Sequence, residues 1–191
     1  MAIRPAWQVD LGRRWTEPHR CHHDIEHLRE VLTALEILAM DGLVFNARVT
    51  RRAAWFHDAV YDVFRDDNEE ASADLARHLI RGTTGERIAA VVMTTKTHQP
   101  GDDPEAVALC DADLAVLGSG RQRYARYCQE IRNEYAHVPE RQFRSRRAEA
   151  LTTLLEHEHL FASPQGRSRW EAAARRNVDA EVRQLVPLNS V

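Results

Sequence analysis

The sequence predicts an all-α fold, a single-domain helical bundle with about eight helices around one core. Apolar residues recur at intervals of three and four over long stretches, which is the spacing that gathers them on one face of a helix. Capping residues, glycines and prolines separate these stretches. Nowhere in the 191 residues does sustained alternation of apolar and polar side chains indicate a strand.

The first two helices are predicted from apolar spacing. Trp7, Leu11 and Trp15 stand four residues apart and predict a short helix that packs on the body of the protein. The range 22–39 carries a longer apolar stripe and is stopped by the turn at Gly42.

The boundaries of the later helices are predicted from end signals. Asn68 is expected to cap a helix that Gly82 ends, and Asp103 before Pro104 is expected to begin another. The remaining expected helices cover approximately 46–57, 68–81, 83–98, 103–117, 121–136, 140–157 and 165–186.

The composition is that of an ordinary soluble globular protein, with 43% hydrophobic and 29% charged residues. No stretch is long and apolar enough to cross a bilayer, and the range 1–10 lacks the apolar block of a signal peptide. Three widely spaced cysteines fit a reducing compartment. We therefore expect a cytoplasmic protein without a membrane partner, and the oligomeric state, monomer or homodimer, stays open.

The charge and motifs exclude several function classes. A net charge of −3 argues against binding to polymeric nucleic acid. Glycine-rich phosphate loops, a GxSxG elbow and a cysteine nucleophile setting are all absent from the sequence.

One short stretch points to metal chemistry. An apolar run ends in the adjacent pair His57 and Asp58, and Asp62 follows four residues after Asp58. An imidazole nitrogen and carboxylate oxygens together suit a divalent ion, and burying them beside Trp55 without a cation would be costly. The alternative is a helix-end pair in which Asp58 only accepts a hydrogen bond from His57.

A second cluster consists of His23 and His27, which are expected to project to one face of the helix over 22–39. The pair resembles the HExxH of zinc peptidases, with Asp24 in place of the glutamate. Aspartate is shorter than the base such a site needs, and no third ligand follows at a suitable spacing. A peptidase of this kind would not need His57 for metal binding, and solvated histidines are the simpler alternative.

Read in order, His27, the pair at 57–58 and Asp113 resemble the HD superfamily of metal-dependent phosphohydrolases. Further segments resemble a small bacterial group of HD-domain proteins of unassigned substrate, over about residues 15–183, which leaves 1–14 and 184–191 as peripheral. His22 and Asp24 depart from the Tyr and Asn that the group has there. The matching segments are Arg20–His27 (R-x-Y-H-N-x-x-H), His57–Asp62 (HD-x-x-Y-D), Asp67–Ala73 (D-N-E-x-x-S-A), Thr95–His98 (T-x-x-H), Asp111–Gly118 (D-A-D-L-x-x-L-G), Ile131–Tyr135 and Ala174–Asn177.

The resemblance implies a metal site formed by His27, His57, Asp58 and Asp113. Such a site accepts Mn, Fe, Co, Ni, Mg or Zn, one ion or two. Asp111, on a different helical face from Asp113, is implied as an outer carboxylate that orients His57 or His27, with a solvent-facing position as the alternative. His23 could serve a second ion or contact the substrate.

Further roles follow from the same resemblance. Asp62 stands where related nucleotide hydrolases carry a proton-handling aspartate, although Tyr61 replaces the neighbouring glutamate; Glu69 is the alternative. Lys96 and His98 are implied as phosphate contacts. Three arginines are implied as contacts to an anionic substrate, or else as partners of glutamates within the bundle. They are Arg132, Arg146 and Arg175.

The sequence thus predicts a metal-dependent phosphohydrolase, an enzyme acting on a phosphomonoester or nucleotide-like small molecule. The alternative is a non-catalytic HD module that binds a metal or a ligand without turnover.

Overall fold

The computed structural model describes residues 6–186, and within this range every regular element is a helix, which confirms the predicted all-α class. The chain divides between Asp113 and Leu114 into two compact units. Each unit is described by itself, and the expectation that 191 residues act as one domain stays a prediction.

The first unit is built from helices joined by short loops. Its α5 packs against α3 and α4, and α3 also contacts α1 and α2. The core consists of buried apolar residues on these helices, among them Leu35, Phe56 and Val92. The elements are α1 (Ala6–Arg14), α2 (Ile25–Met40), α3 (Ala47–Phe56), α4 (Asn68–Leu79), α5 (Thr83–Met93), the 3₁₀ turn η1 (Thr94–Lys96) and α6 (Pro104–Leu114).

One predicted helix start and one predicted cap in this unit are wrong. Helix α2 begins at Ile25 and not near His22, because Asp24 acts as its N-cap and accepts the backbone N–H groups of Glu26 and His27. Asn68 does not cap α4; it is the first residue of that helix, and its side chain turns back to the preceding loop.

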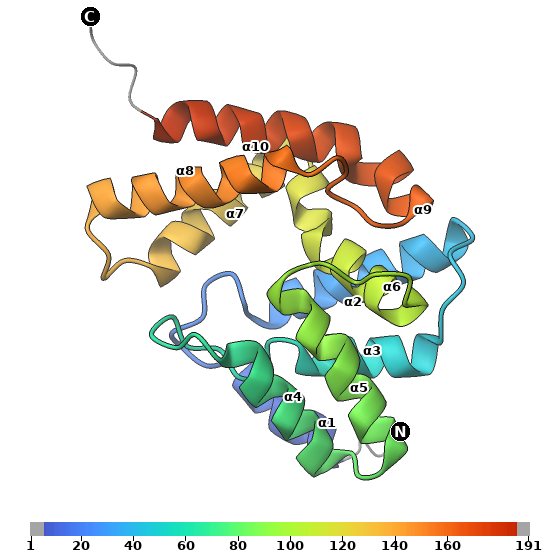
Figure 1. Ribbon diagram of the computed structural model, residues 1–191. Helices are drawn as coiled ribbons and strands as arrows, with labels where there is room; N and C mark the ends of the chain where they lie inside the picture. The colour runs from blue at the N-terminus through green and yellow to red at the C-terminus, as the bar shows by residue number, and fades with distance from the viewer. Residues whose placement is uncertain (1–5, 187–191) are drawn as a thin grey trace, which may run out of the picture. The chain divides into compact units, whose positions relative to one another are not determined.

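The second unit contains η2 (Ala115–Gly118), α7 (Arg121–Glu134), α8 (Glu140–Glu156), α9 (Pro164–Gly166), the π-helical turn η3 (Arg167–Glu171) and α10 (Ala172–Leu185). Helices α8 and α10 lie side by side, as Figure 1 shows. Tyr124, Tyr127 and Phe161 are buried in its core. Gly118 passes so close to Trp170 that an added Cβ would lie 2.6 Å from the Trp170 Cβ, which explains a glycine at the end of η2.

None of the helices between residues 6 and 186 combines the length and the apolar character needed to cross a membrane.

Candidate metal centre

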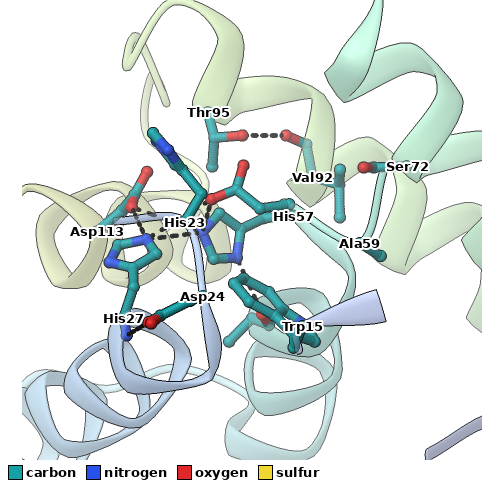
Figure 2. A network of polar contacts seen from close by, with 12 residues as sticks. Trp15, His23, Asp24, His27, His57, Ala59, Ser72, Val92, Thr95 and Asp113 are labelled. Carbon is teal, nitrogen blue, oxygen red and sulfur yellow. Dashed lines mark hydrogen bonds and ion pairs between the residues drawn. The ribbon is translucent and has the colours of Figure 1, made fainter. Parts of the chain in front are cut away.

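Four side chains from three helix ends in the first unit meet at one point. The Nε2 atoms of His27 and His57 lie 3.3 Å apart. Asp113 Oδ1 lies 3.0 Å from the His27 Nε2 and 3.5 Å from the His57 Nε2. Asp58 Oδ2 lies 3.0 Å from the His57 Nε2 and 3.6 Å from the His27 Nε2. Figure 2 shows His27, His57 and Asp113 pointing toward one another.

The cluster is shielded from solvent. The side chains of His27 and His57 are 3% and 1% exposed, and those of Asp58 and Asp113 are each 15% exposed. Trp15, fully buried, lies beneath the two imidazoles, with its ring centre 5.4 Å from that of His57 (Figure 2). Its indole N–H donates to the Trp55 carbonyl oxygen at 3.0 Å, which fixes the ring in place. Charges in such a setting interact strongly because little water screens them.

His57 is oriented by its own helix. It follows the last residue of α3, where the buried Ala53 and Ala54 leave room for close packing. Its Nδ1 lies 2.9 Å from the Ala54 carbonyl oxygen, which can only accept, so Nδ1 carries a proton and donates. The Nε2 lone pair of the neutral ring therefore faces the cluster, as a metal ligand requires.

The donor atoms fit a divalent cation. Adjacent ligands about 2.1 Å from an octahedral ion are about 3.0 Å apart, and tetrahedral ligands about 3.4 Å apart. The distances between a histidine Nε2 and another ligand atom of the four side chains lie between 3.0 and 3.6 Å. His27, His57 and Asp113 offer ligand atoms that all lie within 4.8 Å of one another. Two neutral imidazoles and two largely buried carboxylates would carry uncompensated negative charge without a cation. The charge of the four side chains therefore also fits a divalent cation.

The ionisation of these groups reflects the same need for positive charge. Burial lowers the pKa of His57, but the attraction of Asp58 and Asp113 outweighs burial and raises this pKa well above 6.5. Burial opposes ionisation of the two carboxyl groups, yet His57 beside them lowers the pKa of Asp58 and of Asp113. Without an ion, a proton on His57 Nε2 supplies the positive charge.

We expect metal affinity to rise with pH. A raised pKa keeps the His57 proton in the metal-free protein to higher pH, and an ion must displace it. The attraction between imidazolium and carboxylates therefore stabilises the metal-free fold at low pH and is lost as pH rises through this pKa. Calorimetric titration with Mn²⁺ at about pH 6 and about pH 8 checks the expectation. Equal affinity at the two pH values would contradict it.

Arg20 connects the two ligand-bearing segments, a role that sequence reasoning did not assign. Its side chain is 0% exposed. It donates to the carbonyl oxygens of His23 at 2.9 Å, Asp58 at 2.7 Å and Ala59 at 3.3 Å, and to the Glu17 carboxylate at 3.1 Å. One guanidinium thus holds the backbone of the His57–Asp58 turn against the segment before α2. The only indication of this role in the sequence was that Arg20 is the first residue of the R-x-Y-H-N-x-x-H segment.

Two side chains of α4 hold the loop after Asp58. The Asn68 side-chain amide bonds both the N–H and the carbonyl oxygen of Asp62, each at 3.0 Å. The Ser72 hydroxyl accepts the Val60 N–H at 3.0 Å and donates to the Val60 carbonyl oxygen at 3.3 Å. The D-N-E-x-x-S segment therefore supports the loop that follows the metal ligands.

The predicted roles of Asp111 and of the His23–His27 pair are not borne out by the geometry. His57 Nδ1 bonds Ala54, and His27 Nδ1 has no hydrogen-bond partner among the described residues, so Asp111 orients neither ring. Asp111 is nevertheless buried in α6 and has a polar partner of its own. His23 precedes α2 and does not share a helix with His27; its ring stacks on Tyr61 at 4.0 Å. The geometry of a zinc peptidase helix is therefore absent from this segment.

The residues proposed for protons and phosphate have contacts within the protein. The Asp62 carboxylate accepts the Phe64 N–H at 2.9 Å and so closes its own turn. Lys96 donates to Glu70 at 2.5 Å and to the Asp66 carbonyl oxygen at 3.1 Å. His98 Nε2 lies 2.9 Å from Asp113 Oδ2. Glu69 stands in the first turn of α4 and is half-buried.

The three predicted anion-binding arginines lie in the second unit. Arg132 donates to Glu140 and to the carbonyl oxygens of Tyr135 and Val138. Arg175 donates to Glu171 and to carbonyl oxygens of the loop after α8. Both therefore hold their own unit together, as the predicted alternative of pairing with glutamates within the bundle has it.

Of the predicted arginines, only Arg146 is exposed on α8. Its neighbour Arg147 forms an ion pair with Glu181, at 2.9 Å.

Comparison with known protein families agrees with this geometry. The model of the HD domain family matches residues 24–115, a range that includes all four converging side chains. This range is therefore similar to the HD domain family. Searches of curated proteins and of solved structures found no match. The matched range thus contains two histidines and an aspartate, His27, His57 and Asp113, that could hold a divalent metal ion.

Proposed function

We propose that this protein is a metal-dependent phosphohydrolase that acts on a phosphomonoester or a nucleotide-like small molecule. The observation that supports the proposal is the convergence of His27, His57, Asp58 and Asp113 within the matched HD domain. The more specific resemblance to a small bacterial group of HD proteins belongs to the same proposal.

In this proposal the four side chains hold the ion. When bound, a divalent ion supplies a Lewis acid for a phosphoryl oxygen and an activated water for hydrolysis. The buried Trp15 beneath the imidazoles keeps water out from that side. Arg20 and Ser72 keep the backbone around Asp58 in position.

The proton-handling role remains with Asp62 in this proposal, and the phosphate contact with Lys96. Each must exchange an existing contact for the substrate. Asp62 would release the Phe64 N–H, and Lys96 would leave Glu70. Both contacts lie at the surface, where ion pairs and single hydrogen bonds are weak enough to exchange.

We expect metal-dependent hydrolysis of at least one phosphorylated small molecule. The test is a panel of nucleotides and phosphomonoesters, assayed for phosphate release with Mn²⁺, Co²⁺, Mg²⁺ or Zn²⁺ and again after chelation. Activity that appears only with metal supports the proposal. Equal phosphate release after complete removal of metal would contradict it.

The second candidate function is a non-catalytic HD module that binds a metal or ligand. The observation in its favour is that Asp62, Lys96 and His98 each contact another protein group. Asp62→Asn separates the two functions, because it removes a proton acceptor while keeping the side-chain shape. If the protein is a hydrolase, Asp62→Asn should lose turnover and keep the wild-type metal affinity. If it is a non-catalytic module, the wild type should show no turnover, and the variant should have the same metal affinity as the wild type.

A further inference from the structure

His98 contacts one carboxylate oxygen of Asp113, while the other oxygen faces the candidate metal centre. Asp113 Oδ1 faces the Nε2 atoms of His27 and His57, whereas Asp113 Oδ2 lies 2.9 Å from His98 Nε2. An ionised carboxylate oxygen can only accept a hydrogen bond. His98 Nε2 therefore carries a proton, and this N–H donates a hydrogen bond to Asp113 Oδ2. The sequence placed His98 as a phosphate contact, but its Nε2 is directed at a side chain of the candidate metal centre.

The backbone of His98 is shaped for this contact. Its φ of +51° lies in the left-handed region, and no other non-glycine residue between residues 6 and 186 has a positive φ. Such a conformation is unfavourable for most side chains and persists where surrounding contacts maintain it. Here the His98 N–H bonds the Thr94 carbonyl oxygen at 2.9 Å, closing the turn after η1, and the ring bonds Asp113. The turn thus directs one side chain at one carboxylate oxygen.

We propose that His98 is a positioning residue that holds Asp113 with a single oxygen available to the ion. This inference rests on the metal centre of the proposed function. A carboxylate can offer one oxygen or both to a cation, and a donor on Oδ2 favours the use of Oδ1 alone. With one oxygen from Asp113, the protein supplies four donor atoms, which leaves room for water and a phosphoryl oxygen around a six-coordinate ion.

Co²⁺ is the probe, because its visible absorption reports the number of ligands independently of turnover. His98→Ala should lower Co²⁺ affinity by about 10- to 100-fold, the usual effect of removing a group that orients a ligand. The absorption spectrum should also change, because Asp113 is then free to offer both oxygens. His98→Gln retains an N–H donor near the same position and should recover most of the affinity and the wild-type spectrum.

Two controls separate this role from a merely structural one. The His98 side chain is 28% exposed, so the metal-free variants should unfold at nearly the wild-type temperature. His78→Ala removes an exposed histidine of α4 and should change neither affinity nor spectrum. Reduced Co²⁺ affinity with an unchanged metal-free unfolding temperature supports a positioning role.

The possible failures are distinguishable. Wild-type affinity and spectrum in His98→Ala, or no recovery in His98→Gln, would overturn the inference about His98 alone. Co²⁺ binding by the wild type without hydrolysis of any substrate would overturn the proposed function, while the affinities still decide the role of His98. Absence of Co²⁺ binding by the wild type would overturn both.

Discussion

His57→Ala is expected to abolish tight metal binding and, with it, hydrolysis. The His57 Nε2 lies within 3.5 Å of donor atoms from His27, Asp58 and Asp113, so its loss removes the nitrogen that all three surround. It also leaves the Asp58 and Asp113 carboxylates without the imidazole that contacts both. Affinity for Mn²⁺ should fall by at least about 100-fold, more than for a residue that only orients a ligand. Calorimetric titration and the phosphate-release assay measure the two effects.

A buried histidine can also be needed for folding, so a second variant is required. Asp113→Asn keeps the size of the side chain and removes its charge. We expect it to fold and to lose metal affinity to a similar extent. His78→Ala, on the exposed face of α4, provides the matched histidine control. If His57→Ala and Asp113→Asn both retained wild-type metal affinity, the cluster would not be the metal site.

Arg20→Met is expected to lower the free energy of unfolding by about 3 kcal/mol, because three buried carbonyl oxygens lose a charged donor. Those carbonyls belong to His23, Asp58 and Ala59, so the loss loosens the two segments that bear ligands. Metal affinity should therefore fall as well, although Arg20 itself touches no donor atom of the cluster in the contacts described. Urea unfolding of the metal-free protein and a Mn²⁺ titration measure the two effects.

The geometry of the guanidinium matters as much as its charge. Arg20→Lys keeps the charge but cannot reach several carbonyl oxygens with one planar group, so it should remain destabilised. Arg81→Met, at an exposed position between α4 and α5, should change stability by no more than about 0.5 kcal/mol. Stability of Arg20→Met close to that of the wild type would show that the buried guanidinium does not secure the turn at Asp58.

The four converging residues were predicted from the resemblance to the HD superfamily, which depends on short motifs in the sequence. His57 and Asp58 end an apolar run, and Asp113 follows alanine near the end of a helix. The resemblance of this order to that of the HD superfamily predicted which helix ends must meet. The distances among His27, His57, Asp58 and Asp113 agree with that expectation.

Predictions of which backbone groups an Asp or Asn side chain would bond were less successful. The start of α2 depended on whether Asp24 would be part of the helix or its N-cap. Asp24 is the N-cap, because its carboxylate accepts hydrogen bonds from two backbone N–H groups that have no partner within the helix. The result moved His23 off the helix and onto Tyr61. Similarly, Asn68 was expected to cap α4 but bonds the backbone of Asp62. Asp and Asn bond nearby backbone in several ways, and spacing does not distinguish between them.

The sequence alone determined the helical class, the order of the helices and the residue types able to bind a cation, because apolar periodicity and local motifs are properties of neighbouring residues. Only the tertiary structure decided that Arg20 holds the turn at Asp58, that Asp111 orients neither histidine and that His98 bonds the second oxygen of Asp113. These outcomes depend on the direction of single side chains between segments far apart along the chain. That direction is set by packing and by the need of each buried polar group for a partner.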